Sequence, residues 1–293
     1  MENLWILFAL AAAFNGATSD ALTKKALQLH PEYSVAWLRL LLSLPLLLLC
    51  LFFTPIPPIT KEFVLPAVIA LPLEVVAYLL YLKAIRISPL SLTVPFLALT
   101  PVVLMVIPYF FLGEHITLWA GAGILLLALG SYTLHIRDFK KGIWAPFLSI
   151  RKEKGSLFMI VVAILYGITN TTGKMAIEHS SALFFAATYN TAFFLLLTPV
   201  VLQRSRFQWK ALTSISALKA TLWPGIFTAL TVIFYTLAMS LTQVAYSVTV
   251  CRLSLLIGVV YGHFLFKEGE FKERLTGSLM MLAGFALIVL FQK

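Results

Sequence analysis

The feature that most constrains this chain is an internal duplication of a strongly apolar segment. Segment 84–121 recurs as segment 238–277, at an offset of 154 residues over most of its length. Positions that are identical in the two copies include the pairs Tyr81 and Tyr235, Ala84 and Ala238, Val94 and Val248, Phe110 and Phe264, and Glu114 and Glu268. Each half of the chain holds about five apolar runs of helix length. If five runs cross a membrane, the second half must be inverted relative to the first, which is typical of secondary transporters.

The composition places these runs in a bilayer. The chain is 60% hydrophobic and 12% charged, with a mean hydropathy of +0.95, whereas soluble domains are roughly 45–50% apolar and 25% charged. A transmembrane helix needs about 20 mostly apolar residues. We therefore predict an all-α integral membrane protein with ten transmembrane helices, arranged as two inverted five-helix repeats. The predicted spans are Leu4–Thr23, Ser34–Phe53, Val64–Ile85, Leu90–Phe111, Ile116–His135, Ser156–Ala176, Ala182–Leu202, Lys219–Met239, Val244–Phe266 and Leu275–Phe291.

The predicted repeats occupy residues 3–136 and 155–292. A basic connection at 137–154 separates them, and its Trp144 favours contact with the membrane interface. Basic residues gather at the helix ends joined by odd-numbered connections, whereas the opposite ends hold three: Lys61, Lys174 and Lys293. Because basic residues beside short loops stay in the cytoplasm, this distribution predicts that both termini are external. Nucleic-acid binding is disfavoured, because these charges only flank spans and form no basic helix face.

The duplicated unit resembles the EamA domain of the drug/metabolite transporter superfamily. The matching motifs are SDALTKKAL at the end of the first span, VAWLRLLLSLP in the second, AIRISPLSLTVPFLALTP before and into the fourth, and LGE before a glycine-containing fifth. In the second half the corresponding position to Pro95 is Thr249. The resemblance implies a carrier for amino acids, metabolites or toxic compounds, whose central cavity is lined by the third, fourth, eighth and ninth helices. Many members are drawn with both termini in the cytoplasm, opposite to the orientation that the charges of this chain predict.

Two charged residues lie near the middle of predicted spans, Glu74 in the third and Arg252 in the ninth. A charge at the centre of a membrane helix costs about 2.5–3.5 kcal/mol, so it needs a partner or a water-filled cavity. Glu74 and Arg252 therefore either contact a substrate or form a structural ion pair. Four polar side chains are further candidates for substrate binding, although each could instead form a contact between helices: Tyr78, Tyr81, Tyr235 and Asn190.

A carboxylate in a low-dielectric environment favours its protonated form, which makes Asp20 and Glu74 candidates for carrying a coupling proton. Asp20 could equally cap its helix or pair with Lys24. Arg39 lies close enough to its helix start to extend its side chain to the interface. Pro95, Pro101 and Pro108 interrupt the fourth span and predict a bent helix, with Pro95 and Pro101 as hinge candidates.

The residues disfavour enzyme chemistry. The two aspartates, Asp20 and Asp138, lie in different regions, and no HExxH motif or glycine-rich phosphate loop occurs. We expect a secondary transporter, and more specifically an exporter, that moves a small polar or zwitterionic metabolite by alternating access, without a cofactor or a metal. The alternatives are a multidrug-type efflux carrier and a membrane scaffold that transports nothing. The expected location is the plasma (inner) membrane, and the expected partners are a small-molecule substrate and the lipid bilayer, for a monomer or a homodimer.

Overall fold

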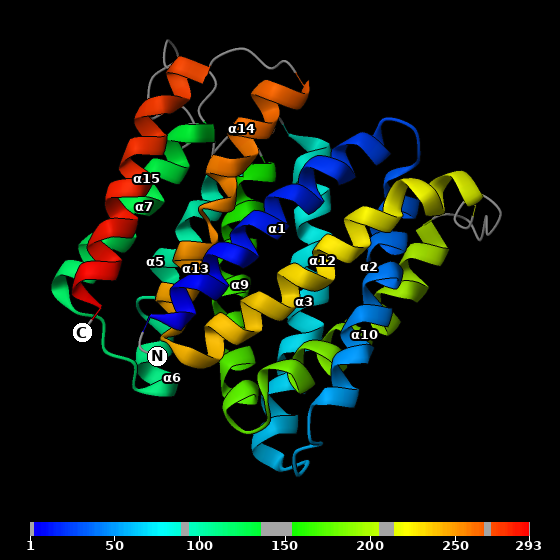
Figure 1. Cartoon of the computed structure of the whole chain (residues 1–293), viewed down its shortest axis with the longest axis horizontal. Helices are drawn as coiled ribbons and strands as arrows, with labels where there is room; N and C mark the ends of the chain where they lie inside the picture. Colours follow the sequence, from blue (N-terminus) through cyan, green and yellow to red (C-terminus); the bar gives the residue numbers. More distant parts are fainter. Residues whose placement is uncertain (1–2, 89–93, 136–153, 205–213, 267–270, 293) are drawn as a thin grey trace. The chain divides into compact units, whose positions relative to one another are not determined.

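The computed structural model describes residues 3–88, 94–135, 154–204, 214–266 and 271–292, and these residues form helices and their connections (Figure 1). Most of the predicted basic connection at 137–154 lies outside the described residues. The chain divides into two compact units. The first comprises Met1–Ala67, Ala176–Thr242 and Leu253–Lys267, and the second comprises Val68–Met175, Gln243–Arg252 and Glu268–Lys293. Each unit therefore takes segments from both sequence repeats.

The first unit is built around α1 (Leu4–Leu27) and α12 (Ile215–Leu241), which pack along each other. The helix α12 also contacts α2 (Glu32–Leu49) and α10 (Ala182–Arg204), while α1 contacts α14 (Ser254–Phe266). A Cβ atom at Gly225 of α12 would lie only 2.6 Å from the Cβ of Leu42 in α2. This glycine is what lets the two backbones approach so closely.

The second unit holds α3 (Lys61–Ile87) from residue 68 onward, most of α9 (Lys154–Glu178), α7 (Leu118–His135), α13 (Val244–Cys251) and α15 (Phe271–Phe291). The helices α3 and α9 meet in a cluster that contains Ala84, Met159 and Val162, all fully buried. At the start of α9, a Cβ on Gly155 would lie 2.6 Å from that of Ser88. The residues with the smallest side chains therefore set the spacing of these helices.

The helices α7 and α15 lie side by side along most of their length (Figure 1). A Cβ at Gly123 would lie 2.7 Å from the carbonyl oxygen of Gly284, and a Cβ at Gly130 would lie 2.7 Å from that of Gly277. These four glycines therefore allow the backbones of α7 and α15 to pack closely.

The fourth and ninth predicted spans are both discontinuous. The fourth consists of the 3₁₀ segment η2 (Val94–Ala98), α5 (Leu99–Val103), a turn, and α6 (Ile107–Leu112), which confirms the expected interruption by prolines. The α6 helix ends at Gly113, whose φ of 66° is left-handed and favours glycine. The ninth span breaks between α13 and α14 at Arg252 and Leu253. The sequence predicts one continuous helix here, because no proline or glycine marks the break.

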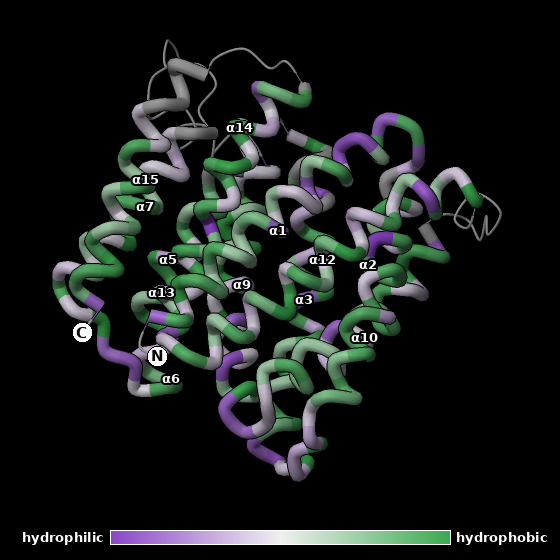
Figure 2. Tube along the Cα trace, in the orientation of Figure 1, coloured by the Kyte–Doolittle hydropathy of each residue, from purple (hydrophilic) through white to green (hydrophobic). Residues whose placement is uncertain are grey.

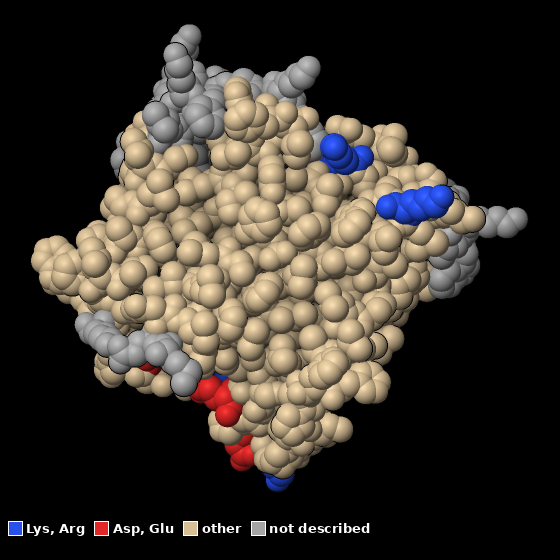
Figure 3. All heavy atoms as spheres, in the orientation of Figure 1, with Lys and Arg blue, Asp and Glu red and all other residues tan. Residues whose placement is uncertain are grey.

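Within the part of the chain that the structure describes, seven helices are long and apolar enough to cross a membrane: Leu4–Leu27, Tyr33–Phe53, Lys61–Tyr81, Lys154–Glu178, Ala182–Gln203, Ile215–Leu241 and Val244–Leu265. The remaining predicted spans appear in the described residues as three shorter apolar helices, Phe96–Leu112, Leu118–Thr133 and Thr276–Phe291. Apolar residues cover much of the helices (Figure 2). On the face drawn in Figure 3, charged side chains lie near the margins and the centre carries none. The all-helical architecture and the apolar exterior support a multi-pass membrane protein.

Candidate functional site

Three of the predicted substrate-binding residues share one face of α3. Glu74, Tyr78 and Tyr81 are spaced four and three residues apart, so a helix places them one above the other. All three side chains are half-buried. The side chain of Glu74 accepts a hydrogen bond from Thr169 of α9, and Thr169 itself is buried. The carboxylate therefore has a polar partner on the neighbouring helix, as an acid within a membrane span requires.

Tyr166 of α9 lies near both the acid and the base. Glu74, Tyr78 and Tyr81 of α3 and Arg252 at the end of α13 all lie within electrostatic range of its side chain. We call Glu74, Tyr78, Tyr81, Tyr166, Thr169 and Arg252 the acid–base cluster; all six belong to the second unit. The structure thus brings four of the predicted site residues together around a tyrosine that the sequence analysis did not select.

Arg252 owes its position to the break in the ninth span. It is the residue that ends α13, and its amide still bonds to the carbonyl oxygen of Thr249 at 3.1 Å. The carbonyl groups at the end of a helix carry partial negative charge, so a guanidinium is favoured there. The side chain is half-buried. A break beside a charged residue is typical of transporter sites, where discontinuous helices line the cavity.

The other predicted residues lie in the first unit. Asp20 forms an ion pair with Arg39, with Arg39 Nη1 3.0 Å from Asp20 Oδ1. Arg39 also donates from Nε to Thr228 Oγ1 at 2.7 Å, and Ser19 bonds to the same hydroxyl at 2.8 Å. Arg39 is thus a structural cross-link between α1, α2 and α12. Asp20 is 71% exposed, so its carboxylate lies close to a helix end rather than deep among the helices.

Asn190 and Tyr235 lie on α10 and α12 of the first unit. Asn190 donates from Nδ2 to the Ala186 carbonyl oxygen of its own helix at 2.7 Å, so one of its two amide donors is already used. Both side chains are half-buried. Their proposed contact with a substrate stays a prediction, as does the proton-carrying role of Asp20.

The duplication extends to the contacts between helices. The hydrogen bond between Ser19 and Thr228 joins the first and eighth predicted spans, and the one between Thr169 and Glu74 joins the sixth and third. Ser19 and Thr169 are 150 residues apart, the offset that also relates Asp20 to Asn170, and Glu74 and Thr228 are 154 apart. The same pair of positions is therefore bonded in each unit. At this pair of positions the second unit has the carboxylate of Glu74, where the first unit has the hydroxyl of Thr228.

Two residues of the cluster, Tyr166 and Thr169, were missed in the sequence. The available signal was the spacing of Tyr166, Thr169 and Asn170, which puts three polar side chains on one face of an apolar helix. Asn170 Nδ2 donates to the Tyr166 carbonyl oxygen at 2.5 Å, so it reinforces α9 beside the cluster. Among the described residues, no three His, Cys, Asp or Glu side chains lie close enough to hold a metal ion.

The acid–base cluster presents an anion, a cation and three phenol groups within one unit. Such a set can bind a ligand that carries both charges, with the guanidinium on a carboxylate and the carboxylate on an ammonium group. The phenol groups add hydrogen bonds and flat apolar surface.

Comparisons with known proteins agree with this architecture. The model of the EamA-like transporter family matches residues 3–135 and again residues 153–290. A solved structure, described as a crystal structure of a protein, is 13% identical in sequence and superimposes with a TM-score of 0.77, covering 100% of this chain and 99% of its own. That likeness is one of fold. No match was found among proteins with curated functions. Two family matches that together span nearly the whole chain show that it belongs to the EamA-like transporter family.

Proposed function

We propose that this chain is a secondary transporter that exports a small polar or zwitterionic metabolite by alternating access. In this proposal, ten spans form two inverted five-helix repeats, residues 3–136 and 155–292, in the plasma (inner) membrane. The observation that supports the substrate class is the acid–base cluster, in which Glu74 and Arg252 both lie within electrostatic range of Tyr166 in the same unit. Family membership supports transport itself.

The charges of the cluster favour binding over a purely structural role. Glu74, Tyr166 and Arg252 each leave part of their surface accessible, which is compatible with contact by a polar ligand. The side chains keep access to a polar ligand, and each charge has hydrogen-bonding or electrostatic partners that lower the cost of holding it in the membrane. Glu74 is also the candidate for carrying a coupling proton, because a proton and the ammonium group of a substrate would compete for its carboxylate.

The direct test uses purified protein in proteoliposomes and counterflow of radiolabelled zwitterionic metabolites. We expect Glu74→Gln and Arg252→Gln each to reduce transport about 10- to 100-fold, because hydrogen bonds to charged groups contribute about 1.5–3 kcal/mol. Lys83→Gln is the matched control. Lys83 is a charged and exposed residue of the same helix, and its Nζ lies 5.0 Å from the centre of the Phe158 ring. Its loss should leave transport near the wild-type rate.

The two candidate substrate classes give different patterns. A multidrug-type carrier for amphipathic cations needs the acid and the aromatic side chains Tyr78, Tyr81 and Tyr166, but gains nothing from a fixed cation. For such a carrier, Arg252→Gln would leave transport of a cationic dye intact while Glu74→Gln abolished it. Wild-type transport by both variants, measured on monodisperse protein with an unchanged melting temperature, would overturn the site. A membrane scaffold would show no counterflow of any tested compound.

A further inference from the structure

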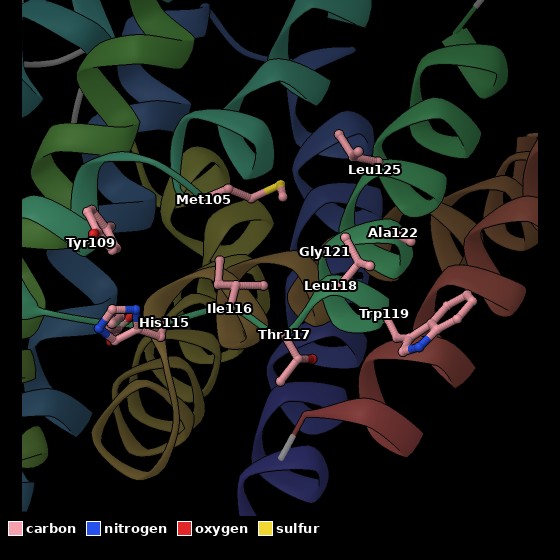
Figure 4. A pocket seen from close by; sticks show the side chains of 11 residues that line it. Met105, Tyr109, His115, Ile116, Thr117, Leu118, Trp119, Gly121, Ala122 and Leu125 are labelled. Carbon is pink, nitrogen blue, oxygen red and sulfur yellow. The ribbon is translucent and has the colours of Figure 1, made fainter.

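A pocket lies in the second unit, and none of its walls belongs to the acid–base cluster. Its volume is about 440 Å³, within the range of about 300–1,000 Å³ that small-molecule sites occupy. Its walls come from the turn before α6, from α6, from the connection after Gly113 and from the first two turns of α7 (Figure 4). None of the lining residues belongs to the acid–base cluster, so an occupant here has a role separate from transport binding.

The long wall of the pocket is one face of α7. Leu118, Gly121, Ala122 and Leu125 are spaced i, i+3, i+4 and i+7 and line it together (Figure 4). Gly121 and Ala122 supply little side-chain volume, which leaves the hollow between the two leucines. Across it lies Met105, whose Cε would be 3.1 Å from a Cβ on Gly121. The result is an apolar groove about 10 Å long along the helix, from seven residues at a rise of 1.5 Å.

One side of the groove is exposed. Leu118, Ala122 and Leu125 are all exposed, and they lie on one of the apolar helices of a membrane protein. Trp119 beside them is exposed and packs against Phe291, with ring centres 5.9 Å apart. Tryptophan is enriched at the level of the lipid headgroups, so this end of α7 fits that level.

The end of the groove that is closed by the connection is polar. Tyr109 and His115 are both exposed and lie edge to face, with ring centres 5.1 Å apart. Neither the phenol group nor the imidazole forms a hydrogen bond with the residues that the structure describes. Glu114 lines the same end, and both its oxygens accept from the Val244 amide, at 2.9 and 3.1 Å. A fixed carboxylate beside two available donors favours a headgroup that carries both charges over one that is only negative.

We propose that this groove binds a zwitterionic phospholipid of the surrounding bilayer. One acyl chain lies along α7 between Leu118 and Leu125, the phosphate lies at His115 and Tyr109, and the ammonium group lies toward Glu114. The match of an apolar groove, a polar end and an interfacial tryptophan selects a lipid over a soluble ligand. The bound acyl chain fills the hollow that the small side chains of Gly121 and Ala122 leave open.

The test is native mass spectrometry of the detergent-purified chain titrated with phosphatidylethanolamine. We expect one phospholipid to bind to the wild type, and Ala122→Leu, which fills the groove with a bulkier apolar side chain, to weaken binding roughly ten-fold. Ala286→Leu is the matched control, because Ala286 is exposed on α15 and lies outside the groove. His115→Ala tests the headgroup, and should weaken phosphatidylethanolamine binding while leaving the binding of palmitate unchanged.

Several results would overturn the proposal. Equal binding by the wild type and by Ala122→Leu would place the lipid elsewhere, since Ala286→Leu controls for added surface. If palmitate or phosphatidylglycerol binds as tightly as phosphatidylethanolamine, the site does not select a zwitterionic headgroup. If His115→Ala binds phosphatidylethanolamine as tightly as the wild type does, His115 does not contact the headgroup. Thermal unfolding of each variant, compared with the wild type, ensures that a loss of binding reports the groove rather than misfolding.

Discussion

Replacing Gly123 by alanine tests how closely α7 and α15 approach each other. A Cβ atom at this position would lie 2.7 Å from the Gly284 carbonyl oxygen, 2.9 Å from Leu287 Cβ and 3.0 Å from Ile288 Cγ1. Ordinary van der Waals contact begins at 3.4 Å, so the nearest atom must move by about 0.7 Å. That atom belongs to the backbone of a packed helix and cannot rotate away, so α15 itself must shift.

The free-energy change follows from two opposing effects. Overpacking of this kind costs about 1–3 kcal/mol, while alanine is favoured over glycine inside a helix by about 0.5–1 kcal/mol. Because backbone and branched side chains oppose the new methyl group on the same side, we expect Gly123→Ala to lower the stability by about 1–2 kcal/mol. At about 2–4 °C per kcal/mol, the melting temperature should fall by about 2–8 °C.

The assay is thermal unfolding of purified protein in a mild detergent, followed by intrinsic fluorescence. Gly258→Ala is the matched control, because a Cβ at Gly258 in α14 would meet no atom within 4 Å. Its melting temperature should stay at the wild-type value or rise slightly. If Gly123→Ala melts at or above the wild-type temperature while the control behaves as expected, the close approach of α7 and α15 is refuted.

The remaining predictions concern orientation and movement. In a background with Cys50 and Cys251 replaced by alanine, the charge distribution predicts that a membrane-impermeant maleimide labels Pro58→Cys in intact cells and does not label Gln28→Cys; the reverse pattern would show the orientation usually drawn for the family. Pro101 is buried in the interrupted fourth span, and Pro101→Ala should slow turnover with near-normal substrate binding, as measured by counterflow and by ligand-induced thermal shift. A variant with unchanged turnover would leave Pro101 as ordinary packing.

The sequence alone was sufficient for the class, the duplication and the family. Runs of about 20 apolar residues in a chain with few charges have no stable arrangement other than membrane helices. Glu74 and Arg252 could be selected from the sequence because a charge within an apolar run is costly and needs a partner or a water-filled cavity. Tyr78 and Tyr81 could be selected because each carries a hydroxyl group that could bond to a polar ligand.

The tertiary structure decided which helices meet. Helices that are apolar on nearly every side carry little information about their partners, because lipid tails are as apolar as leucine and contacts depend on side-chain fit. Nothing in the sequence therefore showed that Tyr166 lies within electrostatic range of both Glu74 and Arg252. The ion pair of Asp20 with Arg39 was not expected for the same reason, since Arg39 reaches it from another helix. Close approach at Gly123 and Gly225 and the break at Arg252 depend on backbone positions that only packing between distant segments fixes.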